Sequence, residues 1–136
     1  MQDADQLAIL NGQLGYPSHP DQVRARLEIL LADPDQSIFV ADQFEKGVVG
    51  WVHVYKQALL ESDLSAEIGG LVVDQDCRRL GIGEKLMEAA ETWARQNGCP
   101  SLHLRSNIIR TGAHAFYRRL GYEINKTQYS FIKRIK

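Results

Sequence analysis

The chain has 136 residues, of which 44% are apolar, and a net charge of −1. This length and composition predict a single domain, residues 1–136, and exclude a disordered tail, a collagen-like fibre and a disulfide-rich miniprotein. The sequence has no surplus of basic residues, which predicts no nucleic-acid partner. It has no apolar run long enough to span a membrane and no apolar signal-peptide core near Met1, which predicts a cytoplasmic protein with no membrane partner.

Two amphipathic helices are predicted at the start of the chain. The first is indicated by apolar residues at helical spacing and a following glycine, namely Leu7, Leu10, Leu14 and Gly15. The second is expected to begin at a Ser18 cap, with Pro20 in its first turn, and to end before Asp33 and Pro34. Its expected buried stripe consists of Val23, Leu27, Leu30 and Leu31.

Three strands are predicted next. Residues 37–41 and 48–57 are rich in strand-forming residues and are joined by a turn at 45–47, which predicts an antiparallel hairpin. In 48–57 one face of the strand carries Trp51, His53 and Tyr55, and the other carries Val52 and Val54. A polar stretch, 57–65, predicts a loop before the third strand, 67–73.

The second half of the chain alternates helices and strands. Residues 83–96 form the strongest amphipathic pattern and end at Asn97-Gly98, which predicts a helix. A strand at 102–105, a helix from Thr111 to Gly121 and a last strand at 129–135 are expected to follow. The order α, α, β, β, β, α, β, α, β predicts a mixed α/β (α+β) domain with one layer of sheet and helices packed on it.

The two cysteines, Cys77 and Cys99, match no zinc spacing and are too few for a disulfide framework. We expect both to be free thiols that fill space in the core. No metal site is predicted.

Residues 71–84 carry the clearest chemical signal. An apolar strand leads into a polar loop with two arginines and two glycines, and a strong helix follows. The first amides of a helix lack internal partners and the helix dipole adds positive charge, so this position favours an anion. Gly81 and Gly83 let the backbone approach a ligand, and Arg78 and Arg79 add charge. The pattern therefore predicts a pyrophosphate site.

Spacing excludes two common phosphate-binding loops. A dinucleotide fold needs a third glycine three residues after Gly83, where the chain has Leu86. A P-loop ends in Gly-Lys-Ser/Thr, whereas Gly83 is followed by Glu84 and Lys85. A loop that only turns the chain stays open as an alternative.

Two motifs occur in order in the second half of the chain. They are Arg78-x-x-Gly81-x-Gly83, between an apolar strand and an amphipathic helix, and Ala113-x-x-Phe116-Tyr117-x-x-Leu120-Gly121-Tyr122. Together they resemble the two signatures of the GCN5-related N-acetyltransferase (GNAT) family, over residues 37–135. The resemblance implies a mixed, mostly antiparallel sheet with helices on both faces. Relatives begin with a strand before the first helix, so we expect this sheet to lack its first strand and to leave an edge that a second copy could cover in a homodimer.

The resemblance also implies acetyl-CoA as co-substrate. The residues expected to bind it are Leu71, Val72, Val73, Arg78, Arg79, Leu80, Gly81, Ile82, Gly83, Glu84, Asn107, Arg110 and Tyr117. The strand is expected to splay from its neighbour and to bind the pantetheine arm through backbone atoms, while the loop holds the pyrophosphate. Many relatives have an asparagine seven residues before the tyrosine; here Arg110 stands there and Asn107 lies three residues earlier, so either could make the contact.

Tyr117 matches the family's general acid, which protonates the departing thiolate; a phenol with a pKa of about 10 suits that role. The general base is left open. Glu67 fits the family's usual position, and on a regular strand it would share a face with residues 71 and 73, although a bulge would change this. His53 is the next candidate, and a water held by backbone groups is the third. The loop carboxylates Glu61 and Asp63 are candidates for binding a cationic substrate.

The resemblance implies an enzyme that transfers the acetyl group of acetyl-CoA directly to a primary amine, with no protein nucleophile. The residues around the second motif look most like small-molecule and aminoglycoside-type members of the family, which does not fix the substrate. The alternative is a catalytically silent acyl-CoA sensor that acts through a protein partner. The presence of Tyr117 and the intact loop favours the enzyme.

Overall fold

Nine elements build the structure, a computed structural model that describes residues 3–78, 80–105 and 111–135. In chain order they are α1 (Ala4–Leu14), α2 (Pro20–Leu31), β1 (Gln36–Gln43), β2 (Gly47–Gln57), β3 (Ser65–Val73), the 3-10 turn η1 (Gln75–Cys77), α3 (Ile82–Gln96), β4 (Leu102–His103) and α4 (Thr111–Arg119). They fall into two compact units, Met1–Arg105 and Ser106–Lys136, so α4 forms the second unit together with the segment that follows it.

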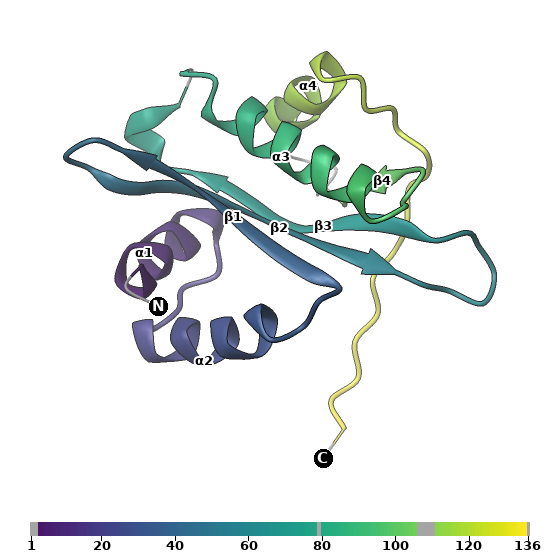
Figure 1. The fold of residues 1–136 in the computed structure, drawn as a ribbon, viewed down its shortest axis with the longest axis horizontal. Coiled ribbons are helices and arrows are strands. Elements are labelled where there is room, and N and C mark those ends of the chain that lie inside the picture. The colour runs from purple at the N-terminus through teal and green to yellow at the C-terminus, as the bar shows by residue number, and fades with distance from the viewer. Residues whose placement is uncertain (1–2, 79, 106–110, 136) are drawn as a thin grey trace. The chain divides into compact units, whose positions relative to one another are not determined.

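The first unit is built on a four-stranded sheet in the order β1-β2-β3-β4. The β1–β2 and β2–β3 pairs are antiparallel and the β3–β4 pair is parallel. Helices α1 and α2 lie on one face of this sheet and α3 lies on the other (Figure 1). The prediction of a mixed, mostly antiparallel sheet with helices on both faces is therefore confirmed.

The alternation of side chains along β2 decides what each face of the sheet contacts. Trp51 packs with the cluster beneath α1 and α2, whereas a Cβ on Gly50 would touch Leu86 and Ile82 of α3. From Gly50 to Gln57, odd-numbered residues of β2 therefore face α1 and α2, and even-numbered residues face α3. Val49 is an extra residue in the pairing with β1, and Val48 before it lies on the α1 and α2 face. The core under α1 and α2 consists of Ala4, Leu7, Ala8, Leu10, Val23, Leu27, Val48 and Val72.

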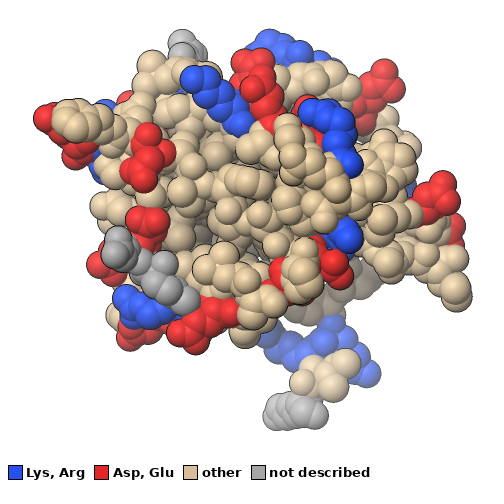
Figure 2. Space-filling view, in the orientation of Figure 1, with Lys and Arg blue, Asp and Glu red and all other residues tan. Residues whose placement is uncertain are grey.

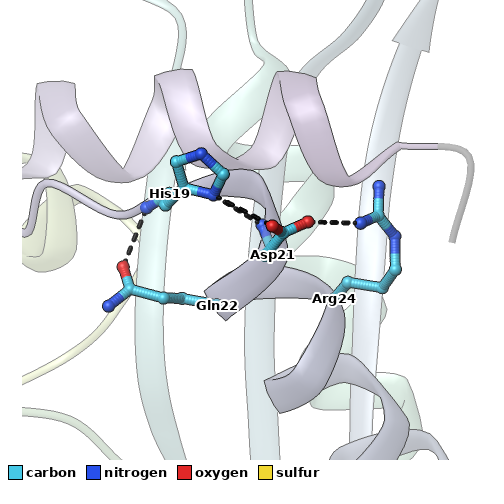
Figure 3. Close-up of polar contacts among 4 residues, drawn as sticks. All are labelled: His19, Asp21, Gln22 and Arg24. Carbon is cyan, nitrogen blue, oxygen red and sulfur yellow. Dashed lines mark hydrogen bonds and ion pairs between the residues drawn. The ribbon is translucent and has the colours of Figure 1, made fainter.

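The start of α2 differs from the prediction, because His19 and not Ser18 is the N-cap. The Nδ1 of His19 accepts a hydrogen bond from the Asp21 amide at 3.1 Å, and Gln22 Oε1 accepts one from the His19 amide at 2.8 Å (Figure 3). These two bonds form a capping box, which satisfies helix amides that would otherwise lack partners. Arg24 pairs with Asp21 at 2.8 Å on the exposed side of the same turn.

Three predictions about the edges of elements are wrong. Leu31 was expected in the buried stripe of α2, but it is the last helical residue and is 61% exposed. The strand expected at 102–105 contains only Leu102–His103. The last strand expected at 129–135 does not form; the segment has no regular secondary structure, and its large apolar side chains are 84% to 92% exposed. An alternating sequence becomes a strand only when a neighbouring strand pairs with it.

Acidic and basic side chains are interspersed on the face of the molecule that Figure 2 shows, as expected for a net charge of −1. Cys77 and Cys99 are both free and buried, as predicted. In the described part of the chain, no helix is long and apolar enough to cross a membrane.

Candidate active site

The outer edge of β3 is open over most of its length in the described chain. The two residues of β4 pair only with Ala66 and Glu67. Residues 68–73 have a hydrogen-bonded strand on the β2 side alone, within the described ranges. The side chains of residues 71–73 are buried or half-buried, so this edge presents mainly backbone donors and acceptors. An extended ligand could pair with it as a further strand would.

The loop after β3 runs from the open edge to the start of α3. It begins with the turn η1 and continues through Arg78, which is exposed on extended backbone, and Leu80, which is also exposed. Gly81 then has φ +79°, a left-handed conformation that favours glycine, and serves as the N-cap of α3. A Cβ on Gly81 would meet nothing within 4 Å, so the space beside this backbone is open.

The N-terminus of α3 lacks the side-chain cap that α2 has. The N-cap is glycine, so it provides no side-chain hydrogen bond to the first amides of α3. Ile82 and Gly83 are half-buried in this first turn, and Glu84 is exposed. With the helix dipole behind them, amides in this position favour an anion. The site that the loop offers therefore fits a phosphate group.

A β-bulge in β3 decides which face Glu67 occupies. His53 pairs with Gly70, but the next residue of β2, Val54, pairs with Ile68, so Gly69 is an extra residue. Without it, the ladder would place Glu67 opposite Lys56, on the α3 face. The strand is therefore not regular, and the alternative left open for a bulged strand holds: Glu67 does not share a face with residues 71 and 73. Glu67 instead lies opposite Tyr55, on the face of α1 and α2.

Glu67 is buried, with 6% of its surface exposed, and its carboxylate contacts three side chains. The Tyr55 hydroxyl donates to Oε2, and Gln57 Nε2 donates to the same oxygen at 3.5 Å. Arg105 Nε lies 3.3 Å from Oε1. Burial and the neighbouring Glu67 carboxylate raise the pKa of Tyr55 to about 12, so this phenol is a hydrogen-bond donor at neutral pH.

His53 lies on the same face, beside Tyr55, with 5.5 Å between the two ring centres. Its Nε2 is 2.7 Å from Oε1 of Gln36, and a Cβ on Gly69 would overlap its Nδ1. Burial lowers the pKa of His53, so the ring is neutral at pH 7. The structure thus brings the two candidate bases, Glu67 and His53, onto one face around the bulge.

Tyr117 belongs to the second unit, where the sequence motif predicts it, in the last turns of α4. Its ring packs edge-on against Phe116 and Tyr122, with ring centres 5.2 Å and 6.1 Å away. The Tyr117 carbonyl also accepts hydrogen bonds from the amides that end the helix, those of Leu120 and Tyr122.

Some expected site residues are not described and others were not foreseen. Arg79, Asn107 and Arg110 lie outside the described residues. The loop carboxylates Glu61 and Asp63 are both exposed. The sequence reasoning missed four partners of the two candidate bases, Gln36, Tyr55, Gln57 and Arg105. The sequence did contain a signal for Tyr55. The pair Gly69-Gly70 inside a strand pattern indicates a bulge, and a bulge there places Tyr55 opposite Glu67. Among the residues described, no cluster of His, Cys, Asp or Glu could hold a metal ion.

The fold is that of an acetyltransferase. A solved structure of AAC(6')-Iy in complex with the bisubstrate analogue CoA-S-monomethyl-acetylneamine matches with a TM-score of 0.83, covering 98% of this chain and 93% of that chain. The two sequences are 21% identical, so this likeness establishes the fold alone.

The chain belongs to the acetyltransferase (GNAT) family, whose model matches residues 4–122. An aminoglycoside N(6')-acetyltransferase type 1 of Stenotrophomonas maltophilia is 28% identical over 124 residues, which cover 88% of this chain and 81% of that protein. An aminoalkylphosphonate N-acetyltransferase of Salmonella typhimurium is 34% identical over 116 residues, which cover 85% and 72%. The family resemblance is confirmed, and the protein is an acetyl-CoA-dependent N-acetyltransferase.

Proposed function

We propose that the protein transfers the acetyl group of acetyl-CoA directly to a primary amine of a small molecule. The names of the two relatives support this class of acceptor, since an aminoglycoside and an aminoalkylphosphonate are both small amines. The observation that carries the proposal is the polar face around the bulge. There a buried carboxylate, Glu67, lies on the strand whose open edge leads to the glycine loop.

In this proposal the donor binds along β3 and the loop. Backbone groups of residues 71–73 pair with the pantetheine arm. Arg78, Arg79 and the first amides of α3, at Gly83 and Glu84, hold the pyrophosphate beside Gly81. The open space at Gly81, where a side chain would stand, supports this assignment. Asn107 and Arg110 are proposed as additional contacts.

The chemistry needs a base, an oxyanion donor and an acid. Glu67 takes a proton from the ammonium, directly or through a water, so that the amine nitrogen can attack the thioester carbon. A backbone N–H of β3 next to the bulge stabilises the oxygen. The carbon–sulfur bond then breaks, and the Tyr117 hydroxyl gives its proton to the leaving sulfur. The nitrogen loses its second proton, which restores the Tyr117 hydroxyl, and Glu67 releases its proton to solvent. The products are an N-acetyl amine and free CoA thiol.

The test is thiol release from acetyl-CoA with three acceptors: neamine, 2-aminoethylphosphonate and a peptide that carries a free N-terminus and a lysine. The phosphonate is included because one of the two relatives is named for an aminoalkylphosphonate. We expect turnover with at least one small amine and none with the peptide. Turnover with the peptide alone would replace the small-molecule acceptor with a protein acceptor.

We also propose that the protein acts in the cytoplasm as a homodimer, without nucleic-acid or membrane partners. Two features support the dimer. β1 is an edge strand of the described sheet, and the segment after α4 exposes Tyr129, Phe131, Ile132 and Ile135. Pairing between two copies would cover both. Analytical ultracentrifugation should give twice the 15.4 kDa mass of one chain; a single-chain mass at all concentrations would contradict the dimer.

A further inference from the structure

The carboxylate of Glu67 is held from both sides by groups that the reaction itself does not require. Tyr55 donates to one oxygen, and Arg105 lies 3.3 Å from the other. The Glu67 side chain is only 8% exposed, whereas that of Arg105 is 77% exposed. A buried carboxylate keeps its charge only when hydrogen bonds and an opposite charge replace its water.

We infer that Tyr55 and Arg105 are positioning residues, which keep Glu67 ionised and fix its orientation for accepting the amine's proton. The inference rests on the proposed role of Glu67 as the base. Tyr55 acts through a neutral hydrogen bond and Arg105 through its charge. Neither residue needs to touch the acceptor or the acetyl group.

The backbone explains why Tyr55 has this partner. It lies directly opposite Glu67 in the β2–β3 ladder, in the register that the extra residue Gly69 creates. In the register without the bulge, Ile68 would oppose Tyr55, and the phenol would have an apolar neighbour. The bulge therefore brings the phenol and the carboxylate together on one face of the sheet.

The Tyr55 hydroxyl is suited to donate a hydrogen bond to Glu67, and it does not compete with Glu67 for the proton of the amine. Burial and the adjacent carboxylate raise the pKa of Tyr55 to about 12, so its proton stays in place over the working pH range. The other titratable groups near Glu67 are His53, on the same face of β2, and His103, opposite Glu67 in β4. His53 is kept neutral by burial, and Ser101 Oγ lies 3.0 Å from Nε2 of His103. Among the described residues, Arg105 is the one that forms an ion pair with this carboxylate.

The test compares Tyr55→Phe and Arg105→Gln with two exposed controls of the same chemistry, Tyr16→Phe and Arg95→Gln. For each variant, kcat is measured against pH with the best acceptor from the thiol-release assay. We expect a loss of about tenfold in kcat, an unchanged KM for acetyl-CoA, and an acidic limb moved to higher pH. Arg105→Lys should restore part of the rate, because it keeps the charge. The controls should follow the parent.

A second readout does not depend on activity. Carboxyl-labelled glutamate in the intact protein gives NMR signals, and the signal missing in Glu67→Gln belongs to Glu67. In Tyr55→Phe and Arg105→Gln that signal should titrate at higher pH than in the parent. If kcat falls while both the pH profile and this titration stay parental, the two residues are merely structural and the inference is wrong.

The same set of variants separates failure of this inference from failure of the proposed base. If Glu67→Gln turns over at the parental rate, Glu67 is not the base, and a positioning role for its partners falls with it. If Glu67→Gln is inactive while Tyr55→Phe and Arg105→Gln match their controls, the base stands and the positioning role is refuted.

Discussion

Tyr117→Phe is expected to lower kcat by about 10²–10⁴-fold, the usual contribution of a positioned general acid. The substitution removes one hydroxyl and leaves the ring, so the packing against Phe116 and Tyr122 should persist. Affinity for acetyl-CoA should change little, because the ring of Tyr117 is kept and most of the proposed donor site is built from β3 and the loop before α3. A large loss of kcat at constant donor affinity is the signature of a group that acts on the leaving thiolate.

The matched control is Tyr122→Phe. Tyr122 lies next to Tyr117 in the same unit, with its ring 6.1 Å away, and loses the same hydroxyl without a proposed role in the chemistry. Both variants are assayed by thiol release and by calorimetric titration with acetyl-CoA. Parental turnover of Tyr117→Phe across the pH range would show that another group or water protonates the sulfur. Equal losses in both variants would indicate damage to α4 instead.

The sequence was sufficient for the elements whose signals are local. The hairpin of β1 and β2, the strong helix α3 and the position of Tyr117 in α4 all follow from periodicity, turn residues and two motifs. The glycine loop was also predictable, because a left-handed N-cap such as Gly81 has few alternatives to glycine. These features depend on residues within one turn or one strand of each other.

The features that the sequence did not predict depend on partners far along the chain. Glu67 changes face because Gly69 is an extra residue in β3. The glycine pair indicates a bulge, but its exact position, and so the partner of Glu67, depends on the pairing with β2. Residues 129–135 alternate as a strand does, yet their structure depends on whether another strand is present. The N-cap of α2 was not predicted for a different reason. Serine is a preferred N-cap residue and histidine is not, so Ser18 was expected where His19 forms the cap. In each case two local structures were compatible with the sequence, and local propensity did not decide between them.

Helices α2 and α3 of the first unit differ in the residue at the N-cap, and this difference decides whether a side chain bonds the first amides. α2 begins with a capping box, which uses side chains to satisfy its first amides. α3 begins at a glycine, and no side chain occupies that position. The difference leaves the first amides of α3 without a bond from an N-cap side chain, at the end of the strand whose outer edge is open in the described part of the chain.

Gly81→Val is accordingly expected to weaken acetyl-CoA binding by more than about tenfold, which corresponds to about 1.4 kcal/mol. Gly81 has φ +79°, a conformation that costs an L-residue about 1–2 kcal/mol and is a clear outlier for a β-branched one. A valine would either fill the open space where the pyrophosphate is proposed to bind, or relax φ and turn the first amides of α3 away. Both outcomes remove the donor site, so the effect does not depend on which occurs.

Gly98 provides the control, because it separates strain from loss of the site. It follows the other end of α3, has φ +75°, and a Cβ there would also meet nothing within 4 Å. Gly98→Val should therefore lower the free energy of unfolding about as much as Gly81→Val, as measured with urea, and bind acetyl-CoA as the parent does. If calorimetry gives both variants the parental affinity, the pyrophosphate does not bind at the α3 N-terminus. If both lose affinity equally, the loss reflects strain in α3 as a whole, and the loop would need to be tested with Arg78→Gln instead.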